Sequence, residues 1–358
     1  MTKLVITIFF ALLLAGCGSK EQSTTAIPIK VVVVTMFEIG DDQGDKPGEF
    51  QLWKQGQNLH QRYDYAAGFH DFYLNPETGV LGMVTGMGNT RASAAIMGLG
   101  LDPRFDLTKA YWLVAGISGI DPADGSIGSA VWADYLVDGD IAHQIDGREI
   151  PKDWPTGYFP LFADAPYPSS DESVLSSSNN GEVFALNKAL SDWAYDLTKS
   201  ITILDTEPMQ ALRGLYTDHP KAMQPPRVMK GDQLAASTFW HGKLFNQWAN
   251  EWTDYWTDGK GNFVTSAMED TGTYQALSYL TKAGKADKNR LMVLRTASNF
   301  TMQPPGLTAA QNLASESSGA GYAGMMPSIQ AAYDVGSTVV EELVENWAQY
   351  ESTTPVKE

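Results

Sequence analysis

The chain has 358 residues, of which 43% are hydrophobic and 19% charged, an ordinary composition for a globular protein with a large core. Its 42 acidic against 25 basic side chains give a net charge of −17, and without a run of Lys or Arg this argues against a nucleic-acid partner. A single cysteine, Cys17, excludes disulfides within the chain and thiolate metal clusters, and the five histidines include no pair at metal-ligand spacing. We therefore expect no metal site.

The N-terminal segment has the pattern of a targeting signal. Residues 1–16 contain one early lysine, Lys3, followed by an apolar stretch. This stretch is shorter than a typical membrane-spanning helix and has the pattern of a signal-peptide core. Leu14-Ala15-Gly16-Cys17 resembles the lipobox of bacterial lipoproteins, where the cysteine thiol receives a lipid; the alternative is an uncleaved anchor with an incidental cysteine. We predict a signal peptide at 1–16, a lipidated Cys17 with a flexible tether at 17–26, and a lipid-anchored protein of the bacterial cell envelope, in the periplasm.

Buried strands and intervening helices fill the rest of the chain. The β-branched run at 29–35 predicts a strand buried on both faces of a sheet that helices cover. Further apolar runs predict strands at 80–84, 110–115, 130–133 and 291–296, and helical spacing predicts helices at 92–101 and 328–347. The sequence thus predicts one α/β domain over 27–350, with a central mixed sheet covered by helices, followed by a disordered tail at 351–358.

Two stretches interrupt this pattern. Residues 146–226 are rich in Pro, Ser and Asp, and we interpret them as a loop insertion that carries one helix at 181–200. Residues 303–327 form a second irregular stretch, which we interpret as a mobile cover over a site.

Polar and glycine-rich segments follow the predicted strands, where ligands bind in open α/β sheets. They are an acidic turn at 36–49, glycine turns at 85–90 and 116–121, and the segments 266–272 and 296–300. The pair Gly86 and Gly88 lacks the third glycine and the acidic residue of a dinucleotide-binding fingerprint, so we reject that site.

The order of these segments resembles the nucleoside phosphorylase and nucleosidase superfamily over most of the domain. The glycine turn at 85–88, the segment 125–134, the pair Met268-Glu269 and the segment 295–299 match the superfamily's motifs in order. More narrowly, T-M-F-E at 35–38 and P-G-E-F-Q-x-W at 47–53 resemble the purine nucleoside permease family. The resemblance implies a nucleoside phosphorylase-like fold, a purine nucleoside ligand and no cofactor.

The resemblance also implies site residues. It places substrate-binding residues at Met87, Gly88, Ser118, Gly119, Met268, Glu269 and Asn299. Phe263, which lies just before the Met-Glu pair, is a further candidate because its ring could stack on the base. The catalytic candidates are Glu38 and Asn299. A carboxylate such as Glu269 can accept hydrogen bonds from both ribose hydroxyls, although the helix macrodipole alone also favours an acidic residue at a helix start. The acidic turn offers further candidates for polarising a water molecule or for holding the 5′ end of the nucleoside, namely Glu38, Asp41, Asp42 and Glu49. The alternative is that these residues only form a solvated acidic loop.

Asn299 stands where related enzymes use an aspartate to protonate the purine. An amide can donate or accept a hydrogen bond but cannot deliver a proton, which favours binding over fast cleavage; the alternative is a turn residue that bonds the local backbone. The superfamily's phosphate-binding arginines are missing, and Arg91 is the one nearby candidate cation. Phosphorolysis is therefore disfavoured.

An aromatic stripe at 239–256 can either stack on a base or pack into the core or against a second subunit.

Taken together, these observations predict an exported purine nucleoside-binding protein that supports nucleoside uptake and salvage with a membrane transporter as partner. The alternative is an extracytoplasmic purine nucleosidase that uses water, and a third interpretation is an envelope protein that keeps the fold without the ligand. The sequence leaves open which nucleoside is preferred and whether the chain forms a homo-oligomer.

Overall fold

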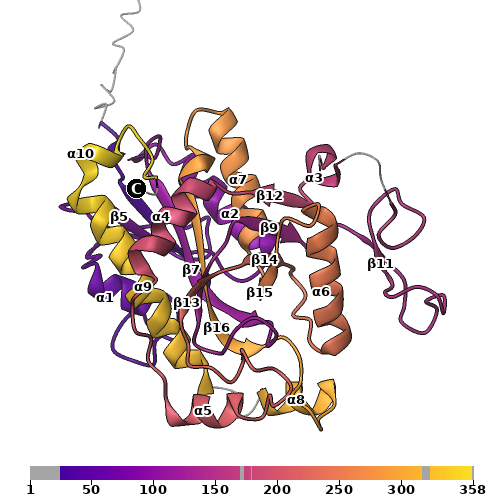
Figure 1. Cartoon of the computed structure of the whole chain (residues 1–358). Coiled ribbons are helices and arrows are strands. Elements are labelled where there is room, and N and C mark those ends of the chain that lie inside the picture. Colours follow the sequence, from indigo (N-terminus) through magenta and orange to yellow (C-terminus); the bar gives the residue numbers. More distant parts are fainter. Residues whose placement is uncertain (1–24, 170–172, 179, 317–322, 357–358) are drawn as a thin grey trace, which may run out of the picture.

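The computed structural model describes residues 25–169, 173–178, 180–316 and 323–356 (Figure 1). The predicted signal peptide and the lipidated Cys17 lie outside the described residues. In the described ranges, none of the helices combines the length and the apolar character of a membrane span.

A mixed sheet forms the centre of the described domain, as the sequence predicted. Its path runs β12 (Val183–Ala185), β9 (Tyr135–Asp138), β14 (Asp232–Ala235), β15 (Phe263–Ala267), β7 (Tyr111–Ile120), β2 (Val31–Thr35), β5 (Val80–Val84), β4 (Phe72–Asn75) and β3 (Gln61–Tyr63). A branch leaves β7 through β16 (Leu291–Phe300), β8 (Ala130–Trp132) and β13 (Val228–Lys230). Strands β2 and β16 are parallel to β7, whereas β15 is antiparallel to it, so the prediction of a mixed α/β sheet is confirmed.

Helices cover both faces of this sheet because the buried strands alternate their side chains between two cores. Val32 and Val34 of β2 belong to the core that contains α2 (Asn89–Gly100) and α7 (Asp270–Lys282). Val31 and Val33 belong to the opposite core, built with α1 (Gln51–Gly56), α4 (Lys188–Thr198) and α9 (Met325–Glu345). Each fully buried valine contributes about 1.5–3 kcal/mol, which explains the continuous β-branched run.

The tryptophans of the aromatic stripe belong to a third core. Trp248, Trp252 and Trp256 project from α6 (Lys243–Trp256) and pack with Leu234 of β14 and Phe263 of β15. The indole N–H of Trp252 donates to the carbonyl of Asp138 at 2.8 Å. Core packing is therefore the interpretation that the structure supports for these three tryptophans.

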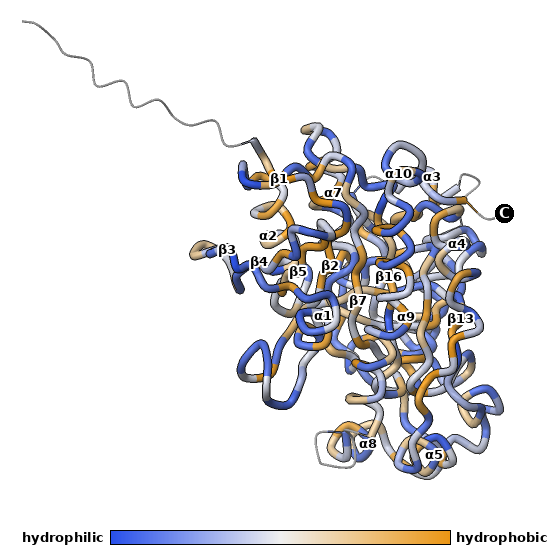
Figure 2. The backbone as a smooth tube through the Cα atoms, turned by 90° about the vertical axis from the view of Figure 1, so that its left-hand side faces the viewer, coloured by the Kyte–Doolittle hydropathy of each residue, from blue (hydrophilic) through white to orange (hydrophobic). Residues whose placement is uncertain are grey.

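The insertion at 146–226 is more structured than one helix. Besides α4 it contains α3 (Val174–Ser177), α5 (Glu207–Arg213), the edge strand β12 and the strand β11 (Tyr158–Phe159), which pairs with β10 (His143–Gln144). Both views place α5 and α8 (Ala309–Glu316) at the end of the molecule opposite α10 (Trp347–Tyr350) (Figures 1 and 2). The short pair β1 (Ile27–Pro28) and β6 (Phe105–Asp106) and the turn η1 (Lys288–Arg290) complete the elements.

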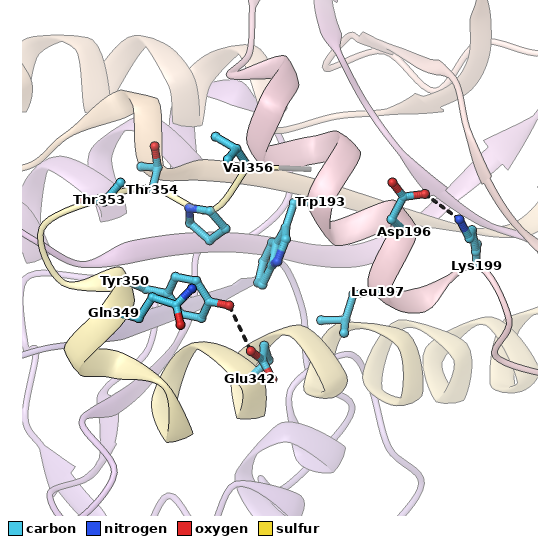
Figure 3. A pocket seen from close by; sticks show the side chains of 11 residues that line it. Trp193, Asp196, Leu197, Lys199, Glu342, Gln349, Tyr350, Thr353, Thr354 and Val356 are labelled. Atoms are coloured by element: carbon cyan, nitrogen blue, oxygen red, sulfur yellow. Dashed lines mark hydrogen bonds and ion pairs between the residues drawn. The ribbon is translucent and has the colours of Figure 1, made fainter. Parts of the chain in front are cut away.

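One other expectation differs from the structure. Residues 116–120 continue strand β7, where the glycines predicted a turn, because Gly116 and Gly119 leave room for side chains from neighbouring elements. Near the C-terminus, residues 353–356 border a hollow of about 680 Å³ beside Trp193 (Figure 3).

Helices α2 and α7 pack closely at Gly272, and this contact leads to a prediction about stability. The N–H of Gly272 donates to Oδ1 of Asn89 at 2.9 Å, and a Cβ at Gly272 would lie 2.8 Å from the Cα of Asn89. Gly272→Ala should lower the free energy of unfolding by about 1–3 kcal/mol in urea titrations, because overpacking outweighs the gain in helix propensity. Gly147→Ala, with no heavy atom within 4 Å of the new Cβ, should stay within about 0.5 kcal/mol. Equal stabilities of the two variants would contradict the close packing.

Candidate functional site

A cavity of about 170 Å³ opens where β2, β7, β15 and β16 end. Its lining comes from these strands and from four connecting loops, and consists of Met36, Phe37, Glu49, Met87, Ile117, Ser118, Gly119, Phe239, Ser266, Ala267, Met268, Glu269, Arg295, Ser298 and Asn299. Half of these side chains are apolar, and among the polar half Glu49, Glu269 and Arg295 bring charge to the cavity. Segments more than 200 residues apart in the sequence therefore share one site.

The structure brings together most of the residues predicted to contact substrate. Six of them line the cavity, namely Met87, Ser118, Gly119, Met268, Glu269 and Asn299. Gly88 supports the lining indirectly, because its N–H donates to Oε1 of Glu269 at 2.9 Å. Gly86 and Gly88 have φ angles of +79° and +96°, a region that favours glycine, so the turn can direct this N–H toward Glu269.

A β-bulge places Asn299 at the cavity. Ala297 pairs with Ser118 and Asn299 pairs with Gly119, so Ser298 is an extra residue in β16. Bulges re-aim side chains next to them, and here the amide of Asn299 reaches the cavity lining. Its Nδ2 also donates to the carbonyl of Phe300 at 3.1 Å, so the amide has the local backbone bond of a turn residue as well.

Arg295 is the cation of the site, and its guanidinium is bonded to two carboxylates and one backbone carbonyl. Its guanidinium donates to Asp270 through Nε and Nη2, to Oε2 of Glu269 through Nη2 at 3.0 Å, and to the carbonyl of Ile117 through Nη1 at 3.2 Å. Burial alone would lower the pKa of Arg295, but the carboxylates of Asp270, Glu269 and Glu49 outweigh it and raise that pKa. Gly116 makes this arrangement possible, because a Cβ there would lie 2.7 Å from Nη1 of Arg295.

Glu49 is the acidic residue of the 36–49 turn that reaches the cavity. Its Oε2 accepts the N–H of Met36 at 2.8 Å, and its Oε1 accepts the N–H of Ile117 at 2.7 Å. Burial raises the pKa of Glu49 from 4.5 to about 8, although Arg295 and the two backbone N–H groups oppose the rise. Burial likewise raises the pKa of Glu269.

Glu38 has a different environment from the one expected of a catalytic group. Its carboxylate accepts the backbone N–H groups of Ile39, Gly48, Phe50 and Gln51, which closes the acidic loop and caps the first turn of α1. It does not contribute to the cavity lining. Its position therefore supports a structural role for Glu38 and gives no support to catalysis.

The aromatic residues at the cavity are Phe37 and Phe239, and Phe263 is not among them. Phe263 is 1% exposed and packs in the core, 5.9 Å from the ring of Trp240. Phe239 lines the cavity and is 56% exposed, so one face of its ring is accessible. The sequence contains several aromatic residues in this region, and no local pattern distinguishes the exposed Phe239 from the buried ones.

The remaining candidates lie elsewhere. Arg91 is exposed, and its Nη1 donates to the carbonyl of Met87 at 3.1 Å without lining the cavity. Asp42 pairs with Nε2 of His70 at 2.7 Å, and Asp45 accepts the N–H of Asp41, so these acids bond within or beside their own loop. Within the described ranges, His, Asp and Glu side chains form no group of three suited to a metal ion.

Comparison with known proteins identifies relatives over nearly the whole chain. A sequence model of the purine nucleoside permease family matches residues 28–355. A purine nucleoside permease of Candida albicans is 30% identical over 90% of this chain and 77% of its own length. A probable purine nucleoside permease of Schizosaccharomyces pombe is 27% identical over 90% of both chains.

Solved structures share the fold at low sequence identity. A putative 5′-methylthioadenosine/S-adenosylhomocysteine nucleosidase of Francisella philomiragia has a TM-score of 0.51 at 14% identity, over 87% of this chain and 98% of its own. A futalosine hydrolase of Helicobacter pylori has a TM-score of 0.52 at 12% identity, over 88% and 98%. The prediction of a nucleoside phosphorylase-like fold is confirmed.

The sequence relatives correct one prediction. They come from fungi, which are eukaryotes, and this overturns the assignment of the chain to a bacterial cell envelope and its periplasm. That assignment depended on a short apolar stretch followed by Leu14-Ala15-Gly16-Cys17, a pattern of small residues that carries little information by itself.

The bonding of Glu38 generates a prediction about stability. Glu38→Gln replaces one acceptor oxygen by an NH₂ group that faces backbone donors, so the free energy of unfolding should fall by about 1.5–3 kcal/mol. Glu77→Gln is the matched control, because the side chain of Glu77 is 71% exposed, and it should change stability by less than about 0.5 kcal/mol. Urea unfolding of both variants checks this. An unchanged midpoint for Glu38→Gln would contradict the structural role and return Glu38 to the catalytic candidates.

Proposed function

This chain belongs to the purine nucleoside permease family, and from that premise we propose that it binds a purine nucleoside in the cavity at the strand ends. Membership in the family supports a role in nucleoside transport. The observation that carries the proposal is the carboxylate of Glu269, buried at the cavity and fixed from two sides. In the transport role, this domain would hold the nucleoside for a membrane transporter partner.

Glu269 has the bonding capacity to hold the ribose. Its Oε1 accepts the N–H of Gly88, which leaves a lone pair on this oxygen. Its Oε2 accepts an N–H of Arg295 at 3.0 Å and, at a longer 3.3 Å, the N–H of Met268. One ribose hydroxyl can donate to Oε1, and the vicinal hydroxyl can take the place of the long Met268 bond at Oε2, whereas deoxyribose lacks one donor. Glu269 stands at the N-cap of α7 but makes no side-chain capping hydrogen bond, so helix capping does not explain its position.

Phe239 and Asn299 suit the base. The exposed ring of Phe239 offers a stacking surface, and such aromatic contacts contribute about 0.5–1.5 kcal/mol beyond area burial. The amide of Asn299 can donate to a purine nitrogen or accept from a ring N–H. Together these two groups would select a flat heterocycle with polar edges.

The remaining lining favours an uncharged ligand. Met36, Phe37 and Met87 contribute apolar surface, and the guanidinium of Arg295 already serves carboxylates. A phosphate in this cavity would meet the carboxylates of Glu49 and Glu269 and one cation, Arg295, which is already paired with Glu269 and Asp270. We infer that nucleosides bind and nucleotides are rejected.

A nucleosidase is the second candidate function. It is favoured by Glu49, whose carboxyl lies at the cavity beside Glu269 and Arg295 and could polarise a water molecule. Against it stands Asn299, which cannot supply a proton to the departing base. Binding is therefore the function that the geometry supports better.

Incubation of the full chain with inosine and adenosine separates these functions. With the binding function, chromatography should detect less than one equivalent of free base per chain, with or without phosphate. Repeated turnover without phosphate would replace the binding proposal by hydrolysis. Turnover that requires phosphate would show phosphorolysis and contradict the inferred rejection of anions.

Glu269→Gln tests the assignment of the sugar site. The variant should bind adenosine more weakly by about 1.5–3 kcal/mol, the range for hydrogen bonds to a charged group, and should bind free adenine with a smaller loss. The parent chain should prefer adenosine over 3′-deoxyadenosine, and the variant should lose most of this preference. Calorimetry measures the affinities of both proteins for adenosine, adenine and 3′-deoxyadenosine, with Glu77→Gln as the control that binds like the parent. Equal losses for nucleoside and base would contradict the assignment.

A further inference from the structure

The charged groups beside the cavity do not balance. Three carboxylates, those of Glu49, Glu269 and Asp270, surround the single guanidinium of Arg295, and all four residues are at most 4% exposed. If all were ionised, the cluster would carry an excess of two negative charges out of contact with bulk water. Buried charges persist when they are paired and hydrogen-bonded, so one of these carboxylates is the favoured place for a proton.

The hydrogen bonds single out Glu49 as that carboxylate. The N–H groups of Arg295 are directed to Asp270, Glu269 and the carbonyl of Ile117, and none of the bonds described for its guanidinium goes to Glu49. Asp270 additionally accepts from Nε2 of Gln233 at 3.1 Å. Glu49 has only two backbone N–H donors, and it also lines the cavity where a ligand would cover it.

The groups around Glu49 determine the sign of its response to a ligand. From β16 it faces the positive charge of Arg295, and from the start of α7 it faces the negative charge of Glu269. From β2 and β7 it faces uncharged backbone N–H groups, and Glu38 in its own loop directs its carboxylate to backbone donors. An uncharged ligand that fills the cavity removes water and adds no positive charge, so it disfavours the ionised form of Glu49.

We propose, as a consequence that depends on the proposed function, that the cavity binds its nucleoside together with one proton, which Glu49 carries. The bound proton brings the buried cluster closer to neutrality when the ligand closes the cavity. Binding is then coupled to pH through one named side chain, and the ligand of the site is a neutral nucleoside plus a proton.

The pH range of the effect follows from the free protein. Burial raises the pKa of Glu49 to about 8, so below this pH the proton is already present and binding takes up little. Above it, the free protein has lost the proton and binding must restore it. The Kd should therefore rise by up to about tenfold per pH unit above pH 8, and by roughly tenfold between pH 6.5 and 9.

Isothermal titration of the full chain with adenosine tests the proposal, because the base of adenosine stays neutral in this range. Titrations at pH 8.5 in Tris and in EPPS, buffers with different ionisation enthalpies, give the number of protons taken up. We expect more than half a proton per adenosine at pH 8.5 and nearly none at pH 6.5. Equal heats in both buffers at pH 8.5, or proton release, would overturn the proposal while leaving nucleoside binding intact.

Glu49→Gln is the diagnostic variant and Glu77→Gln its surface control. Glu49→Gln should bind adenosine with a pH-independent Kd and less than about a fifth of a proton taken up at pH 8.5, whereas Glu77→Gln should behave like the parent. Proton uptake that persists in Glu49→Gln would overturn the assignment to Glu49. If this variant does not fold, the pH dependence of the parent's Kd decides alone. Absence of binding at both pH values would overturn the proposed function, and this proposal with it.

Discussion

One buried guanidinium holds the functional end of this molecule together. Arg295 projects from β16, bonds the carbonyl of Ile117 in β7, and pairs with Glu269 and Asp270 where β15 passes into α7. Each of these carboxylates would be costly to bury alone, and removal of one partner of such a buried pair typically costs about 3–5 kcal/mol. Three elements are therefore tied to one charge. The same network fixes the carboxylate that we assign to the sugar, so stability and binding depend on the same contacts.

Small local features turn this network into a binding site. Gly88 has a backbone conformation that lets its N–H reach Glu269, and Gly116 leaves the space that Arg295 and Glu49 occupy. The bulge at Ser298 brings Asn299 to the cavity. Below them, the α2–α7 contact at Gly272 keeps the glycine turn and Glu269 at a constant separation. A side chain added at any of these glycines would therefore change the geometry of the Glu269 carboxylate without contacting the ligand itself.

The sequence predicted the elements and the presence of Met268-Glu269 at the cavity better than the rest of the site. Buried strands such as 80–84 are marked by their own apolar residues, and Met268-Glu269 is a recognisable pair in the right order along the chain. Glu49 could not be separated from its acidic neighbours, because its burial depends on how Glu38 closes the loop through four backbone bonds. Phe239 and Phe263 could not be separated either, because Phe239 is exposed before α6 whereas Phe263 on β15 packs against the tryptophans of α6, and this difference depends on tertiary packing. The assignment to a bacterial envelope failed because the four residues Leu14-Ala15-Gly16-Cys17 at the end of an apolar stretch do not define a compartment.

The central claim is that a purine nucleoside occupies the cavity beside Glu269. A crystal structure of the full chain with adenosine tests this claim most directly. We predict electron density with both ribose hydroxyls within hydrogen-bond distance of Glu269, and with the base between Phe239 and Asn299. Density for adenosine in the hollow beside Trp193, or a ribose that points away from Glu269, would contradict the account.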